Sequence, residues 1–175
     1  MRIIDLSKDI YSGMPVYPGD PEVSIEQVST VGADGWQVSQ LKLGTHTGTH
    51  VDAFSHMHPE LASIDAIALE QFIGPAQLVR VHDGAFPKGL GLVFDETVDE
   101  SVLESVIVAN PPFVAGDVSE DLERALLGRG IVTFTDLINL DQLPRGETFL
   151  FIGLPLKIRQ ADGSPVRAVA VLDYS

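Results

Sequence analysis

A cluster of histidines and one aspartate is the part of the sequence best suited to do chemistry. Four of the five histidines lie between His46 and His58, and the segment from His46 reads His-Thr-Gly-Thr-His-Val-Asp, ending at Asp52. Imidazole nitrogens and carboxylate oxygens are common ligands of zinc, manganese and iron. Three such ligands with an open coordination position are typical of a catalytic metal site. We therefore predict that His46, His50 and Asp52 bind one divalent metal ion.

The geometry of an extended chain tests whether these three side chains can meet. From Leu41 to Asp52 the threonines favour a strand, in which all three candidate ligands share one face. A strand rises ~3.3 Å per residue, so His50 and Asp52 would lie ~7 Å apart, but His46 and His50 would lie ~13 Å apart. The second distance is too long for one ion. We therefore predict a bend or bulge at Gly48, since glycine adopts such conformations most readily.

His56 follows the three candidate ligands after a predicted turn at residues 53–55. A zinc ion would polarise a carbonyl and lower the pKa of a bound water toward ~7. His56 would then lie close enough to act as the general acid or base. The alternative interpretation is that these polar side chains are exposed, or hydrogen-bonded in the interior, and bind no ligand.

Composition limits the possible classes of protein. The chain has 175 residues, of which 45% are hydrophobic and 21% charged, as expected for one globular domain. Its net charge of -14 repels nucleic acids and anionic membranes, but a local pocket can still bind a small molecule. Cysteine is absent, so any metal must be bound by nitrogen and oxygen. We find no signal peptide and no membrane span, so a cytoplasmic location is expected.

Short runs of β-branched and aromatic residues alternate with glycine and proline, which predicts a strand-rich α/β domain. The clearest helix is expected over Glu120–Leu127, where Ser119 can cap the first turn and Gly128 can end the last. A short helix is possible over Ile67–Phe72. Besides the extended run from Leu41 to Asp52, strands are expected at residues 3–6, 23–28, 78–82, 91–94, 106–109, 131–134, 149–152 and 166–172.

The pattern His-x-Gly-Thr-His-x-Asp-x-x-x-His, present from His46 to His56, resembles the signature of the metal-dependent cyclase family. This family includes bacterial kynurenine formamidase and isatin hydrolase. The resemblance implies a single domain over residues 1–175 with a swivelling β/β/α fold, and assembly into a homodimer or a larger homo-oligomer. Four other stretches carry the resemblance along most of the chain: Tyr17–Pro21, Ala125–Ile131, Leu154–Ile158 and Ser164–Val169.

The resemblance also implies an activity. Members of this family hydrolyse a small amide or cyclic amide by metal-bound hydroxide, so an arylformamidase-like hydrolase is expected. By residue match, His46, His50 and Asp52 would hold zinc or manganese, and His56 would be the catalytic acid or base. The substrate would be a small molecule, but the sequence does not identify it or the residues that bind it.

The sequence departs from the family at two further ligand positions. Relatives commonly have a histidine on the late helix and a glutamate on the next strand, where this chain has Glu123 and Thr135. Glu123 could replace the histidine as an oxygen ligand, and Asp136 lies beside Thr135, the position of the missing glutamate. The alternative, which we favour from the sequence, is that Glu123 is simply a solvated helix residue. We therefore expect one ion rather than two. Two alternatives stay open: a degenerate family member that binds a ligand or partner without catalysis, and a purely structural subunit. His58 and His82 are expected at the surface.

Overall fold

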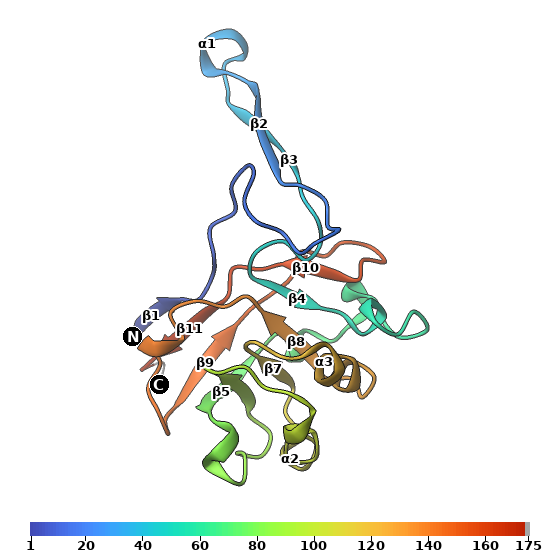
Figure 1. Ribbon diagram of the computed structural model, residues 1–175. Coiled ribbons are helices and arrows are strands. Elements are labelled where there is room, and N and C mark those ends of the chain that lie inside the picture. Colours follow the sequence, from blue (N-terminus) through green and yellow to red (C-terminus); the bar gives the residue numbers. More distant parts are fainter. Residues whose placement is uncertain (174–175) are drawn as a thin grey trace.

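The computed structural model describes residues 1–173 and contains, in that range, a nine-stranded mixed sheet (Figure 1). The strand order is β1-β11-β9-β5-β6-β7-β8-β4-β10. Neighbours are parallel from β5 to β8 and antiparallel elsewhere. The strands are β1 (Arg2–Asp5), β4 (His50–Asp52), β5 (Ile73–Val79), β6 (Gly91–Phe94), β7 (Phe113–Ala115), β8 (Val132–Thr135), β9 (Thr148–Ile152), β10 (Gly163–Pro165) and β11 (Val169–Leu172).

The two hydrophobic cores lie on opposite faces of the sheet, because successive strand side chains point to opposite sides. Helices α2 (Leu103–Ala109) and α3 (Glu120–Leu127) cover one face, where Leu122 and Leu126 pack with Leu92. On the other face, the rings of Phe113, Phe134 and Phe151 pack with centroids 4.8 to 5.5 Å apart. Parallel strands buried on both faces account for the continuous apolar runs in the sequence. The predicted strand-rich α/β fold is confirmed.

Helix α3 forms where the sequence predicts it. The Ser119 hydroxyl accepts a hydrogen bond from the Leu122 amide at 3.2 Å, and Glu120 lies in the first turn, where an acidic side chain stabilises the helix dipole. Leu122, Leu126 and Leu127 are buried, so the apolar face of the helix lies against the sheet. This packing fixes which residues of α3 approach strand β8 and therefore the site described below.

Three predicted elements are wrong or only partly right. Residues 106–109 are not a strand but the second half of α2, because burying Val106 and Ala109 against the sheet outweighs the β propensity of a Val-Ile-Val run. The possible helix over 67–72 is reduced to one 3-10 turn, Leu69–Gln71. The strand expected at 78–82 ends at Val79, and His82 lies exposed in the following 3-10 turn, as expected for a surface residue.

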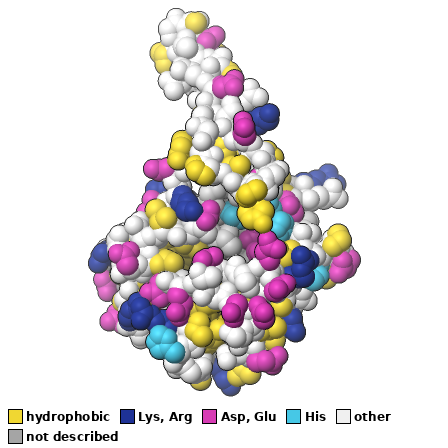
Figure 2. Space-filling model, in the orientation of Figure 1, with side chains coloured by type: hydrophobic (Ala, Val, Ile, Leu, Met, Phe, Trp, Pro, Cys, Tyr) yellow, Lys and Arg dark blue, Asp and Glu magenta, His cyan; other side chains and the backbone are white. Residues whose placement is uncertain are grey.

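A two-stranded arm projects from the body of the protein (Figure 1). It consists of β2 (Ser24–Ser29) and β3 (Val38–Lys42), which pair with each other, and of the short helix α1 (Val31–Asp34) at the tip. Every residue of α1 and β3 is exposed, including Trp36 between them with 64% of its surface accessible. Figure 2 shows the arm standing clear of the body, so the cores described above do not extend into it.

Helix length also bears on membrane association. Within residues 1–173, none of the helices has both the length and the apolar character needed to cross a bilayer.

Candidate metal centre

The segment between β3 and β4 brings the candidate ligands together by turning back on itself. Strand β3 ends at Lys42 and β4 begins only at His50, so the extended run expected from Leu41 to Asp52 is interrupted between these two strands. Gly48 has φ +62°, a left-handed conformation that glycine adopts without steric cost. The ring centroids of His46 and His50 consequently lie 5.2 Å apart instead of the ~13 Å of a straight strand. The predicted bend at Gly48 is confirmed.

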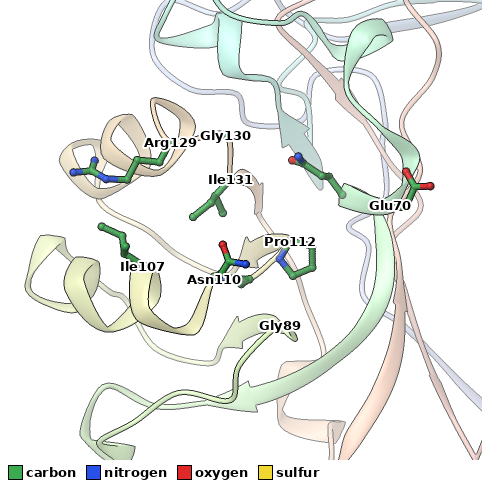
Figure 3. A pocket seen from close by; sticks show the side chains of 10 residues that line it. Glu70, Gly89, Ile107, Asn110, Pro112, Arg129, Gly130 and Ile131 are labelled. Carbon is green, nitrogen blue, oxygen red and sulfur yellow. The ribbon is translucent and has the colours of Figure 1, made fainter.

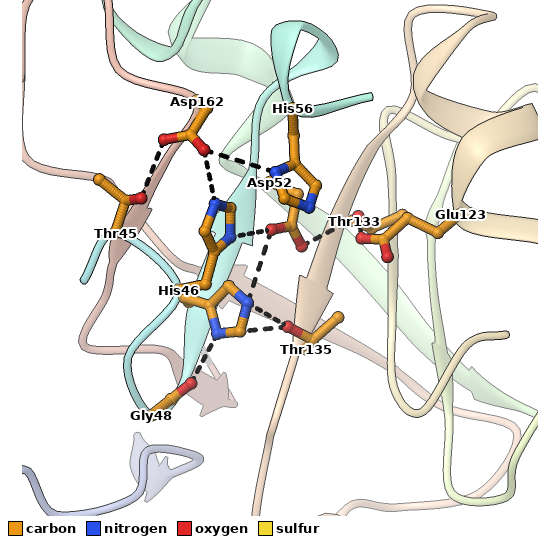
Figure 4. Close-up of polar contacts among 10 residues, drawn as sticks. Thr45, His46, Gly48, Asp52, His56, Glu123, Thr133, Thr135 and Asp162 are labelled. Atoms are coloured by element: carbon orange, nitrogen blue, oxygen red, sulfur yellow. Dashed lines mark hydrogen bonds and ion pairs between the residues drawn. The ribbon is translucent and has the colours of Figure 1, made fainter. Parts of the chain in front are cut away.

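His46, His50 and Asp52 converge on one point (Figure 4). The Asp52 Oδ1 atom lies 2.7 Å from His46 Nδ1 and 3.5 Å from His50 Nε2. One ligand atom from each residue lies within 4.8 Å of the others, and the Asp52 residue is only 1% exposed. Two imidazoles around a buried carboxylate form a donor set that suits a divalent cation with nitrogen and oxygen ligands.

The orientation of His50 is set by the turn that precedes it. Its Nδ1 donates a hydrogen bond to the Gly48 carbonyl oxygen at 2.6 Å, because a carbonyl can only accept. In the neutral ring, Nε2 is then the nitrogen without a proton, and it faces Asp52, with the Thr135 hydroxyl 2.9 Å away. A backbone carbonyl that fixes the tautomer of a histidine is a common partner of metal-ligating imidazoles. Thr135 lies at the site through this contact.

The charges at the site are strongly coupled. Burial would lower the pKa of His46, but hydrogen bonds to Asp52 and Asp162 and their negative charges outweigh it and raise the pKa to about 9. Burial would raise the pKa of Asp52, but the hydrogen bond from His46 and the charges of both histidines hold it below its ordinary value. Without an ion, a protonated His46 therefore neutralises the buried carboxylate.

Glu123 of α3 reaches the same site from the opposite side (Figure 4). The Thr133 hydroxyl lies 2.8 Å from Glu123 Oε1 and 3.2 Å from Asp52 Oδ2. Burial and the charge of Asp52 raise the pKa of Glu123 to about 8, so its carboxyl is protonated at neutral pH. The Thr133 hydroxyl has only one proton, so it can donate to only one of the two carboxyl groups. The proton on Glu123 provides the donor for the other contact. The interpretation of Glu123 as a solvated helix residue is wrong.

Asp136 does not take the place of a missing ligand. Its carboxylate forms an ion pair with the Lys8 ammonium at 2.8 Å, and both side chains are substantially exposed. Of the two residues considered as replacements, only Glu123 approaches the metal-ligand cluster.

His56 lies in the 3-10 turn Phe54–His56 that follows β4, with its ring centroid 4.1 Å from that of His46. Its side chain is 30% exposed, and its Nδ1 lies 3.5 Å from Asp162 Oδ2. The structure thus brings the predicted acid or base to the predicted ligands. His58 is turned away, since its Nε2 donates to the Arg124 carbonyl oxygen at 2.8 Å, and it is partly buried rather than a free surface residue.

Asp162 is the site residue that the sequence did not reveal. It immediately precedes β10, which pairs with β4 and places Gly163 opposite Asp52. Its Oδ2 atom lies 2.9 Å from His46 Nε2, and its Oδ1 accepts a hydrogen bond from the Thr45 hydroxyl at 2.8 Å. The hydrogen bonds from His46 and Thr45 outweigh the effect of burial and lower the pKa of Asp162 to about 2.

The cluster opens into a cavity of about 610 Å³. Its lining residues include His46, His50, His56 and Glu123. In Figure 2, histidine side chains (cyan) lie just below the base of the arm, with acidic side chains (magenta) beside them. A cavity of this size accommodates a small organic molecule. A second hollow of about 710 Å³ lies between the end of α2, the turn that follows α3 and the 3-10 turn that precedes β5 (Figure 3), but none of its described lining residues is a histidine or an aspartate.

Comparison with known protein families supports the assignment made from the histidine motif. The family model described as Cyclase matches residues 4–111, which is more than half of the chain. The chain belongs to the cyclase family. Its relatives include two proteins named kynurenine formamidase: that from Salinibacter ruber is 32% identical over 97% of both chains, and that from Paracidovorax citrulli is 28% identical over 94% of both.

Solved structures of other proteins have the same overall fold as this chain. Isatin hydrolase A from Labrenzia aggregata, bound to benzyl benzoate, has a TM-score of 0.84 at 22% identity and covers 97% of this chain and 93% of its own. Isatin hydrolase A from Ralstonia solanacearum has a TM-score of 0.79 at 22% identity, with 98% and 92% covered. At this level of identity the similarity establishes the fold.

Gly163 is required for the close packing of this cyclase-family site. A Cβ atom at this position would lie 2.7 Å from Cε1 of His46 and 2.9 Å from the Val51 carbonyl oxygen. A Gly163→Ala variant should therefore displace the His46 ring and weaken zinc binding by roughly 10- to 100-fold, as for other disturbances of ligand orientation. Titration calorimetry of the metal-free variant and wild type with zinc measures the difference in affinity. Gly74→Ala in β5, where a Cβ meets open space, is the matched control. Equal zinc affinity in both variants would contradict the prediction.

Proposed function

We propose that this protein is a metal-dependent hydrolase that cleaves a small amide or cyclic amide, with His46, His50 and Asp52 as ligands of one zinc or manganese ion. The observation that carries the proposal is the convergence of these three residues, within 4.8 Å of one another, in the lining of a cavity of small-molecule size. Similarity over 97% of the chain to a protein named kynurenine formamidase supports an aryl formamide as the substrate class.

A divalent cation bound here would supply Lewis-acid polarisation of the scissile carbonyl and would lower the pKa of a nearby water. The residues of the chain do the rest. Asp52 contributes a buried negative charge, and the Gly48 carbonyl holds the proton of a neutral His50 on Nδ1, which leaves Nε2 to bind the ion. His56 is partly exposed at the cavity and packed against His46, a position from which it can take a proton from water and return it to the leaving amine.

The protonation of Glu123 supports the proposal that the site binds one ion and not two. The protonated carboxyl of Glu123 shares Thr133 with Asp52, so it adds no second negative charge at neutral pH. A second cation would require a further anionic ligand where this chain has Thr135. The assembled ligands and the nearby His56 favour catalysis over the alternative of a family member that only binds a ligand.

Metal analysis combined with a substrate screen tests the proposal. Purified protein should contain close to one zinc or manganese ion per chain and should hydrolyse an aryl formamide. Dialysis against a chelator should abolish turnover, and either metal should restore it. His56→Gln should keep the ion but lose most of the turnover, typically 100-fold or more for a general acid or base. Full activity of metal-free protein would refute the role of the metal. Bound metal without turnover of formamides, lactams or lactones would refute hydrolysis.

A further inference from the structure

His46 has a carboxylate at each of its two ring nitrogens (Figure 4). Its Nδ1 lies 2.7 Å from Asp52, and its Nε2 lies 2.9 Å from Asp162. An imidazole that binds a cation through one nitrogen must carry its remaining proton on the other. The Nδ1 atom faces the ligand cluster with His50, so the proton of a metal-bound His46 belongs on Nε2, where Asp162 can accept it.

Asp162 is itself held on both sides, although 47% of its side chain is exposed. The Thr45 hydroxyl donates to its Oδ1 at 2.8 Å, and its backbone carbonyl accepts from the Ala53 amide at 2.9 Å. Its Oδ2 is thereby directed between two imidazoles, His46 Nε2 at 2.9 Å and His56 Nδ1 at 3.5 Å. One carboxylate oxygen thus contacts both a candidate ligand and the candidate acid or base.

We infer that Asp162 is a positioning residue that orients two histidines at once. By accepting the Nε2 proton of His46, it selects the tautomer in which Nδ1 is free for the ion. Its charge, 3.5 Å from Nδ1 of His56, favours the proton on that nitrogen, which leaves Nε2 of that ring as the nitrogen that exchanges protons in the cavity. The Gly48 carbonyl does the same for His50, so each candidate histidine ligand has its own acceptor. The inference rests on the proposed function, since it assigns Asp162 a task toward the proposed ion.

A second ion among His46, His56 and Asp162 is the competing interpretation, because these three also offer ligand atoms within 4.8 Å of one another. Such an ion would need Nε2 of His46 as a ligand while Nδ1 served the first ion. The imidazole would then have to lose both of its protons. A carboxylate that accepts a hydrogen bond from a metal-ligating histidine is the far more common arrangement, and it requires one ion only.

Titration calorimetry of metal-free protein with zinc tests the inference, because it measures metal affinity and does not rely on enzymatic activity. Asp162→Ala should bind zinc roughly 10- to 100-fold more weakly than the wild type. Asp162→Asn keeps an acceptor oxygen at nearly the same position and should recover a large part of that loss. Asp141→Ala, at an exposed aspartate of the described surface, is the control and should bind zinc as the wild type does.

Nitrogen-15 NMR of the zinc-loaded proteins provides a readout that a merely structural role would not change. In the wild type the His46 ring should carry its proton on Nε2 only, and the Asp162→Ala variant should show a mixture of tautomers or a weakened Nε2–H signal. If the alanine variant does not fold, the tautomer of the zinc-loaded wild type decides the question, because a proton on Nδ1 of His46 would contradict the inference.

Three results would overturn the inference, and they are distinguishable. Wild-type zinc affinity and tautomer in Asp162→Ala would show that Asp162 positions nothing, with the proposed function intact. Two zinc ions in the wild type and one in Asp162→Ala would make Asp162 a ligand instead. A wild-type protein that binds no zinc or manganese would overturn the proposed function and this inference together.

Discussion

An Asp52→Asn variant should bind zinc or manganese more than about 100-fold more weakly than the wild type and should lose measurable hydrolysis. The expected loss exceeds the 10- to 100-fold typical of residues that only orient a ligand, because Asp52 would be a ligand itself. It is also the one anion among the three proposed ligands, and it is almost completely buried. Asparagine has nearly the same shape, so the change removes charge without opening a cavity.

Metal content after gel filtration and calorimetric titration of the refilled protein measure this effect. Asp141→Asn, which removes one negative charge from the exposed surface, controls for the general electrostatic attraction of a chain with net charge -14. A circular dichroism spectrum and melting curve show whether the Asp52 variant keeps the fold. A folded Asp52→Asn variant that retains wild-type metal affinity would rule out the proposed ligand set.

Metal affinity should rise about tenfold per pH unit between pH 7 and about 9, because an ion must displace the proton of His46. The pKa of that ring is raised, so its proton is bound below about pH 9 and competes with the ion there. The affinity is therefore lost as the pH falls. Asp52 contributes no dependence in this range, since its pKa lies below the ordinary value and its carboxylate is already ionised.

The number of protons released also reveals what Glu123 does. Its pKa of about 8 means that it holds a proton at pH 7. If Glu123 remains protonated beside the ion, close to one proton should leave per ion bound, but close to two should leave if it becomes a ligand. Calorimetry at pH 7 in buffers with different ionisation enthalpies counts these protons. The Glu123→Gln variant should release close to one proton per ion bound in either case. An affinity that does not change with pH would contradict the assignment of His46.

Sequence alone predicted that His46, His50 and Asp52 cluster, because these residues are close together in the chain. His46, His50 and Asp52 are separated by a few residues, and the impossibly long spacing of a straight strand pointed to the bend that Gly48 provides. Asp162 could not be found in this way. It reaches the site only because β10 pairs with β4, a long-range pairing that local patterns do not encode.

The other failures have the same physical origin. Which side of α3 faces the sheet decides whether Glu123 is solvated, and that depends on the packing of Leu122 and Leu126. The Val-Ile-Val run of α2 favours a strand locally, but burial against the sheet makes it helical. Assembly into a homodimer or larger oligomer, the cytoplasmic location and the choice between zinc and manganese stay predictions.

The projecting arm has a thermodynamic consequence for the protein. Its strands β2 and β3 pair only with each other, and an isolated two-stranded hairpin is marginally stable in water. In the free chain the arm should therefore open and close as a small cooperative unit of its own, with a free energy well below that of global unfolding. The hydrogen bonds of its backbone would exchange with solvent on a fast time scale while the nine-stranded sheet and the histidine cluster remain intact. The rigid site and the opening arm are thus joined in one chain but governed by two separate equilibria.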